Sequence, residues 1–320
     1  MSRRPRLRVG VFGTGALGRH HVRILSGLDE VEFVGAYDPD AERIATVSEE
    51  FGATVFEDVD SLADRIDAAV VAAPTKVHAE IGCRLLERGI HVMVEKPISR
   101  TLEEADALIS AASASDRVLA VGHVEFYNPA VQALLTIGLP PGFAEVHRMG
   151  EFSARSLDID VVRDLMIHDL QILQSLDPSP LKSLSAVGVR VLTDRDDIAN
   201  ARLEFESGLV ANLTASRISD QKIRKLRVIV PGMYLSLDYQ KQEIKGYRLR
   251  KGGGGRDLER LDVEIVEDEP LAAELRAFVS ACHGESVPLV RGQDGRRALE
   301  TALEVCDRIE RQREIVQAFA

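Results

Sequence analysis

Hydrophobic and polar positions follow two different patterns along the chain, and the change comes near residue 122. Before it, stretches of helical periodicity separate five short apolar runs, at residues 7–12, 31–37, 67–72, 91–95 and 118–121. Nearly unbroken apolar runs are typical of strands in a sheet that is covered on both faces. Strands that alternate with helices in this way predict one doubly wound parallel domain.

After residue 122 the pattern favours a second domain. Helical periodicity at residues 129–137 and 160–176 is followed by strand-like segments with turn residues between them, at 186–192, 199–206, 209–216, 225–231, 233–239, 243–250 and 260–266. Strands joined by short turns pair antiparallel. Closing helices are predicted at residues 271–283 and 295–312, the second capped by Asp294. The predicted fold class is therefore α/β, with a parallel-sheet domain at 1–122 and a domain with a large, mostly antiparallel open sheet at 123–320.

The glycines at positions 13, 15 and 18 predict a dinucleotide-binding turn. They follow the first apolar run and open a helix, and Asp38 stands twenty positions after Gly18. The glycine spacing is weak evidence by itself, but this strand–helix context is what the Rossmann fingerprint requires. The helix N–H groups would then face the phosphates. A glycine loop that only caps a helix is the weaker alternative.

Asp38 indicates which dinucleotide is bound. Its carboxylate suits a ribose 2′-hydroxyl, and Asp40 adds a second negative charge where a 2′-phosphate would lie. The nearest arginine, Arg43, is a helical turn further on. NAD is therefore favoured over NADP.

The fourth apolar run ends in Glu95 and Lys96, and Pro97 stops it. Ligands of open α/β sheets bind just outside the carboxyl ends of the strands. A lysine there can grip a substrate hydroxyl or stabilise a developing alkoxide. A surface lysine after a strand is the alternative.

Asp164 and His168 stand four positions apart in a helical segment with apolar residues between them. They should share one helix face, and a buried acid and histidine are paired or functional. Asp164 can orient His168, which can serve as a base near neutral pH. A structural Asp–His pair is the alternative, and the neighbouring Asp169 is interpreted as structural. A dinucleotide site, a strand-end lysine and this pair together indicate a dehydrogenase; a nucleotide-sensing protein without turnover is the rival interpretation.

Composition and charge exclude some classes of binding partner. The formal net charge is −11, with 51 acidic residues against 40 lysines and arginines, which argues against nucleic acid or an anionic membrane as a partner. The three cysteines are odd in number and far apart, so we expect a reduced, cytoplasmic protein. His20, His21 and the other histidines lack acids or cysteines at metal-ligand spacing, so no metal site is expected.

Four motifs occur in order along the chain, namely Gly13-x-Gly15-x-x-Gly18, Pro74 with His78, Glu95-Lys96-Pro97 and Asp164-x-x-x-His168. This combination resembles the glucose-fructose oxidoreductase/inositol dehydrogenase (Gfo/Idh/MocA) family over nearly the whole chain. The resemblance implies a Rossmann domain followed by a domain with a large open sheet, and NAD(P) bound along residues 13–18. It also implies that Lys96 and His168 are catalytic, with Asp164 beside them, and that the Lys96–Pro97 bond is cis.

Within the family, residues 122–130, 164–170, 197–202 and 211–217 resemble the UDP-N-acetylglucosamine 3-dehydrogenases. The expected substrate is therefore a UDP-N-acetyl-hexosamine oxidised at C3, with a free polyol such as inositol as the alternative. The expected cofactor contacts are Gly13, Thr14, Gly15, Ala16, Leu17, Gly18, Asp38, Pro74, Thr75, His78, Glu95, Lys96 and His123. The expected substrate contacts are Lys96, Asn128, Arg155, Asp164, His168 and Arg217.

Two further expectations concern one residue that differs from the family pattern and the oligomeric state of the protein. Phe126 stands where such proteins usually have an arginine, so a polar contact near the nicotinamide is missing or supplied from elsewhere. Few sequence elements remain to cover the second face of the large sheet, so we expect a homodimer or homotetramer packed sheet against sheet.

Overall fold

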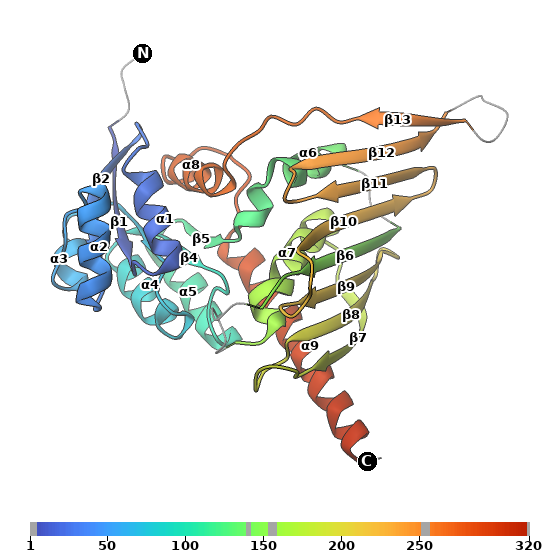
Figure 1. Ribbon diagram of the computed structural model, residues 1–320. Helices are drawn as coiled ribbons and strands as arrows, with labels where there is room; N and C mark the ends of the chain where they lie inside the picture. Colours follow the sequence, from blue (N-terminus) through green and yellow to red (C-terminus); the bar gives the residue numbers. More distant parts are fainter. Residues whose placement is uncertain (1–4, 139–141, 153–158, 251–256, 319–320) are drawn as a thin grey trace. The chain divides into compact units, whose positions relative to one another are not determined.

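The computed structural model describes residues 5–138, 142–152, 159–250 and 257–318 (Figure 1). The chain divides into two compact units. The first contains residues 1–124 and 269–299, and the second contains residues 125–268 and 300–320. The chain thus returns to the first unit after residue 268, and the boundary expected at residue 122 stays a prediction.

A five-stranded parallel sheet forms the centre of the first unit. Its order is β2-β1-β3-β4-β5, with β1 at Leu7–Phe12, β2 at Val31–Tyr37, β3 at Ala68–Val71, β4 at His91–Glu95 and β5 at Leu119–Gly122. All five apolar runs predicted as strands are confirmed. The strand order reverses at β1, which makes the carboxyl end of β1 the switch point where such sheets bind ligands.

Helices connect these strands, at α1 (Ala16–Leu25), α2 (Ala41–Phe51), α3 (Val59–Ala63), α4 (His78–Glu87) and α5 (Leu102–Ser115), and α8 (Pro270–Cys282) joins them from far along the chain. Figure 1 shows α8 beside α1, and the two pack together. Leu275 and Phe278 of α8 lie in the same hydrophobic core as Val9, Val22 and Met93. Sequence periodicity predicted this helix but could not show which core it joins.

The second unit contains the eight-stranded sheet. Its order is β13-β12-β11-β10-β6-β9-β8-β7, and only β6 and β9 pair parallel among these strands. The strands are β6 (Phe143–Met149), β7 (Leu181–Val189), β8 (Ile198–Phe205), β9 (Val210–Ser216), β10 (Ile223–Val230), β11 (Met233–Asp238), β12 (Glu243–Leu249) and β13 (Leu258–Asp262). The prediction of a large, mostly antiparallel sheet is confirmed.

Helices α6 (Pro129–Ile137) and α7 (Ile167–Leu176) lie on one face of this sheet (Figure 1). The C-terminal part of α9 (Gly292–Ala318) covers the same face, where a Cβ on Gly188 of β7 would come within 2.8 Å of the Ile309 side chain. Cross-strand register places an apolar row on the opposite face, formed by Tyr247, Tyr234, Ile229, Phe143 and Val210. Tyr234 and Tyr247 are 36% and 44% exposed, so this face is only partly covered within the chain.

Three local predictions were wrong. The segment predicted as one helix from residue 160 begins with a π-helical turn at Val162–Met166. Helix α9 begins at Gly292, so Asp294 lies in its first turn and is not the N-cap residue. The Asp294 carboxylate accepts the backbone N–H of Arg291 at 2.8 Å. Strand β7 begins at Leu181, five residues before the predicted start. The prediction missed its first half because this edge strand lacks regular apolar alternation there. None of the helices in the described ranges is both long and apolar enough to cross a membrane.

Candidate functional site

The glycine turn after β1 has the shape that a dinucleotide phosphate requires. A Cβ on Gly13, whose φ is +91°, would lie 2.6 Å from the backbone nitrogen of Ala73, and one on Gly18 would lie 1.9 Å from the carbonyl oxygen of Gly13. A Cβ on Gly15 would meet no atom of the described chain within 4 Å. Gly13 and Gly18 are therefore required by the fold, whereas Gly15 keeps the approach to the helix open. No described side chain caps α1 at Gly15, so its first N–H groups suit a phosphate.

Asp38 is fixed directly beside this turn, at the end of β2. Its Oδ2 accepts the N–H of Thr14 at 2.6 Å and the Thr14 hydroxyl at 3.1 Å, and its Oδ1 accepts the N–H of Asp40 at 2.9 Å. The carboxylate therefore links the glycine turn to the second strand, which is where the fold places a ribose. The open α1 N-terminus and the anchored Asp38 together fit a nicotinamide adenine dinucleotide.

Glu95 forms the buried base of the strand-end motif. Its Oε1 lies 2.7 Å from Nε2 of His21, and its Oε2 accepts the backbone N–H of Lys96 at 3.2 Å. Burial opposes ionisation of Glu95, but the hydrogen bond and charge of His21, with the charge of Lys96, bring its pKa below the ordinary value. Glu95 is thus an anion that holds the backbone at Lys96. The Lys96–Pro97 bond is cis, as the resemblance implied.

Two further histidines surround this motif. The ring of His78 is buried between backbone carbonyls, with Nε2 2.8 Å from the oxygen of Ala73 and Nδ1 3.1 Å from that of Pro97. It therefore braces the segment after β3, which contains Pro74 and Thr75, against the segment after β4. His123 follows β5 and is wholly buried, and burial together with the positive charge of Lys96 lowers the pKa of His123 to about 3. His123 is consequently a neutral ring at the end of the sheet.

In the second unit, the candidate acid and base lie where the π-helical turn meets a regular helix. Asp164 is in the π turn, and His168 is in the first turn of α7 with 8% of its surface exposed. Such turns are rare and occur frequently at functional sites. The predicted helical pair therefore exists, but its first member stands on a wider helical turn than the sequence indicated.

A buried ion network holds the helix next to His168. Arg148 of β6 donates from Nε to Asp169 at 2.7 Å and from Nη2 at 2.8 Å, and its Nη1 donates to Glu125 at 2.6 Å. The Tyr239 hydroxyl also donates to Asp169, at 3.2 Å, and its ring lies 4.9 Å from the Arg148 guanidinium. Arg224 donates to Glu125 at 3.2 Å. Asp169 is therefore engaged in this network, in agreement with its interpretation as structural.

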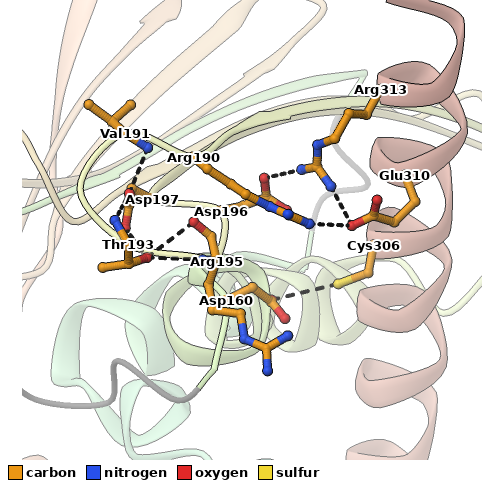
Figure 2. Close-up of polar contacts among 10 residues, drawn as sticks. All are labelled: Asp160, Arg190, Val191, Thr193, Arg195, Asp196, Asp197, Cys306, Glu310 and Arg313. Carbon is orange, nitrogen blue, oxygen red and sulfur yellow. Dashed lines mark hydrogen bonds and ion pairs between the residues drawn. The ribbon is translucent and has the colours of Figure 1, made fainter. Parts of the chain in front are cut away.

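Asp160 and the loop at residues 190–197, which contains Asp196 and Asp197, hold the start of the π turn (Figure 2). Asp160 accepts the N–H of Arg163 at 2.9 Å and lies 3.6 Å from the sulfur of Cys306 on α9. Asp197 accepts three successive backbone N–H groups, of residues 191–193, and these bonds outweigh its burial and lower its pKa to about 2. Its carbonyl accepts the N–H of Arg217, and the carbonyl of Asp196 accepts that of Val161. Backbone hydrogen bonds thus join Asp197 to Arg217, and Asp196 to Val161 just before the π turn.

Two of the residues expected to contact substrate, Arg217 and Asn128, are engaged in hydrogen bonds within the second unit. The buried Arg217 donates to the carbonyl of Ile159 at 2.8 Å, and the neighbouring Arg163 is paired with Asp160 at 2.6 Å. Asn128 caps α6 and donates to the carbonyl of Tyr239. Phe126 is buried edge-on against Tyr127. Arg155 lies outside the described residues.

Sequence reasoning missed two buried charged residues, Arg148 and Glu274. Neither Arg148 of β6 nor Glu274 of α8 belongs to a recognisable sequence motif. Both are almost fully buried. A lone charge at an inward position of a periodic segment was the available signal, because such a group needs a partner or a proton.

Family models match both parts of the chain. A model described as "Oxidoreductase family, NAD-binding Rossmann fold" matches residues 7–123, and the "GFO/IDH/MocA C-terminal domain" matches residues 131–232. The UDP-N-acetylglucosamine 3-dehydrogenase of Acidithiobacillus ferrooxidans is 36% identical over 93% of this chain and 96% of that protein. The myo-inositol 2-dehydrogenase of Thermotoga maritima is 25% identical over 92% and 93%.

Solved structures show the same fold. The structure of the Acidithiobacillus ferrooxidans UDP-N-acetylglucosamine 3-dehydrogenase superimposes with a TM-score of 0.89, at 35% identity over 96% of this chain and 99% of that one. A levoglucosan dehydrogenase in complex with NADH and levoglucosan superimposes with a TM-score of 0.82 at 18% identity, covering 96% and 98% of the two chains, which shows likeness of fold alone.

Proposed function

Because this chain belongs to the Gfo/Idh/MocA family of NAD-binding oxidoreductases, we propose that it oxidises the C3 hydroxyl of UDP-N-acetylglucosamine or a close relative. The product would be a 3-keto sugar nucleotide. The observation that carries the proposal is the 36% identity to a UDP-N-acetylglucosamine 3-dehydrogenase over almost the full length of both chains. The inositol dehydrogenase above covers as much of the chain at lower identity, which supports a polyol less well.

We assign three residues to the chemistry. NAD⁺, when bound along residues 13–18, would supply the acceptor for the hydride of the oxidised carbon. His168 takes the proton of the substrate hydroxyl, and Asp164 keeps its ring oriented. The Lys96 ammonium donates to the same oxygen as negative charge develops on it. The anchoring of Lys96 by Glu95, and of α7 by Arg148 and Asp169, supports these roles because it fixes the backbone from which each group acts.

A diphosphate-bearing substrate needs a cation that the protein does not neutralise completely. Arg224 fits this requirement, because it shares Glu125 with Arg148 and its side chain stays 35% exposed. The charge of Asp164 also acts on it. Arg224 therefore supports a nucleotide-sugar substrate better than Arg163, which has Asp160 as its own carboxylate.

Turnover separates an enzyme from a nucleotide sensor. The purified protein would be mixed with NAD⁺ and a panel of nucleotide sugars, N-acetyl sugars and cyclic polyols, and NADH fluorescence would be followed. An increase in NADH fluorescence over time in the presence of one of these compounds supports the dehydrogenase. Saturable NADH binding without turnover of any member would favour the sensor.

Replacement of Asp38 should change the choice of cofactor. Asp38→Ala removes both the ribose acceptor and the charge that repels a 2′-phosphate, so kcat/KM with NAD⁺ should fall while relative use of NADP⁺ rises. Asp38→Asn is the matched variant, because it keeps an acceptor for Thr14 but loses the charge. Steady-state kinetics with each cofactor measure the ratio, and an unchanged NAD⁺/NADP⁺ ratio in both variants would remove Asp38 from the ribose site.

We further propose that the protein is a homo-oligomer assembled through the partly covered face of the eight-stranded sheet. The apolar row from Tyr247 to Val210 supports this, since an exposed apolar face usually marks a partner surface. Light scattering at micromolar concentration should give a dimer or tetramer, and a monomeric mass would contradict the proposal. The three cysteines are unpaired, which supports a reducing, cytoplasmic setting.

A further inference from the structure

Glu274 is a buried acid for which neither the fold nor the proposed chemistry accounts. It lies on α8, is 0% exposed, and neither of its carboxylate oxygens has a hydrogen-bond partner among the described residues. An isolated ionised carboxylate in such a position would be very costly, so the group must carry a proton or share one. A purely packing role would be served by an apolar side chain.

Helix α8, which carries Glu274, shares a core with the elements around the strand-end motif Glu95-Lys96-Pro97. Helix α8 packs against α1, which carries His21, and Leu275 shares a core with Met93 of β4. Nδ1 of His21 is also buried without a hydrogen-bond partner in the described chain, while its Nε2 faces Glu95. The other titratable groups of α1, α8 and the strand-end motif are Arg19, His20, His21, Arg23, Glu95, Lys96, Arg276 and Cys282. Among them, Glu95 is the one whose charge acts on Glu274.

We infer that Glu274 keeps its proton inside this core, so that Glu95 is the one ionised carboxylate of the two acids. Glu95 then remains a single anion against His21 and the backbone N–H of Lys96. Two carboxylates buried in one core cannot both ionise cheaply, so the proton stays on Glu274, which has no hydrogen-bond donor of the described residues beside it. Glu274 is thus a positioning residue that acts on Lys96 through Glu95.

The protonation states of the two acids agree with this division. Burial, and after it the charge of Glu95, raises the pKa of Glu274 well above its ordinary value. Against the same burial, His21 and Lys96 bring the pKa of Glu95 below its ordinary value. Divergent pKa values in a neighbouring pair are the usual sign of different assigned roles.

The stability test does not depend on substrate or cofactor. A raised folded-state pKa makes the contribution of Glu274 fully present below about pH 4.3, the ordinary carboxylic value, and lost as the pH rises through the folded-state pKa. Glu274→Gln cannot ionise and escapes this loss. Its Tm minus that of the native chain should therefore increase by at least about 3 °C between pH 5 and pH 8.

Three variants complete the stability test. Glu269→Gln, at the N-cap position just before the same helix but exposed and paired with Arg23, should show no such widening. In a Glu95→Gln background the widening for Glu274→Gln should be smaller, because the repelling charge is gone. Glu274→Met, which is also neutral, should show the same pH trend and serves if the glutamine variant does not fold. A Tm difference that stays constant with pH would overturn the inference.

A kinetic readout tests the positioning role and rests on the proposed function. At alkaline pH, ionised Glu274 would repel Glu95 and loosen the turn at Lys96, so kcat/KM of the native chain should fall there. Glu274→Gln should keep its kcat at pH 7 and move this alkaline limb upward by at least about one pH unit. An unmoved limb together with a widening Tm difference would reduce Glu274 to a structural residue. Absence of turnover in the native chain would instead count against the proposed function and leave the stability result intact.

Discussion

His168→Ala is expected to lower kcat by about 10²–10⁴-fold, the usual contribution of a positioned acid–base group. The imidazole takes the proton that leaves the substrate hydroxyl, and no neighbouring side chain of α7 can replace it, because Asp169 is committed to Arg148. The dissociation constant for NAD⁺ should change little, since the glycine turn and Asp38 belong to the first unit. Stopped-flow NADH formation and NAD⁺ binding by calorimetry would measure the two quantities.

His147→Ala is the matched control for this experiment. His147 belongs to β6 of the same unit but points to the face of the sheet opposite Val146, which is buried. Its removal should leave kcat within about twofold, as expected of a surface substitution. Near-normal turnover of His168→Ala would show that the histidine is only a structural element of α7.

Arg148→Met should destabilise the protein by about 3–5 kcal/mol, the cost of removing one partner from a buried ion pair. Arg148 is 2% exposed, and its guanidinium is the cation that Asp169 and Glu125 share, so both carboxylates would be left buried without it. Burial opposes the ionisation of Glu125, but the charge of Arg148 keeps its pKa below the ordinary value. Urea unfolding at pH 7 measures the difference in unfolding free energy.

Arg227→Met provides the comparison on the adjacent strand. Arg227 forms one ion pair, with Glu145 at 2.6 Å, and its side chain is 41% exposed. Exposed pairs contribute about 0–1 kcal/mol, so this variant should remain close to the native chain. Equal losses for the two variants would show that the Arg148 network is no more important than a surface pair. In addition, Arg148→Met should reduce kcat in the folded protein, because α7 loses the contact next to His168.

The fold was predictable where one local pattern determined it. The runs at β1, β3 and β4 are apolar almost throughout because both faces of the parallel sheet are covered, and few other structures produce this pattern. The helix at α8 was predictable as an element, but not as part of the first unit. Amphipathic periodicity shows that a face is buried and not which core receives it.

The glycine turn and the strand-end lysine could likewise be predicted, because their chemistry is contained in consecutive residues. The groups that hold them could not. His21 and Glu95 are 74 positions apart, and Arg148 and Asp169 are 21 apart, so no local window connects them. The π-helical turn at Asp164 also lacks a sequence pattern of its own, and it depends on the loop at Asp196 and Asp197, which binds the backbone of Val161.

We propose that the chain oxidises a nucleotide sugar and not the sugar alone. The direct measurement is NAD⁺-dependent turnover of UDP-N-acetylglucosamine beside N-acetylglucosamine and myo-inositol, with a coupled aminotransferase that consumes the keto product and so draws the equilibrium forward. We predict a kcat/KM for UDP-N-acetylglucosamine at least about 100-fold above that of either other compound, because charge-assisted hydrogen bonds to the diphosphate are lost without the nucleotide. Equal or faster turnover of the compounds that lack the nucleotide would contradict the claim.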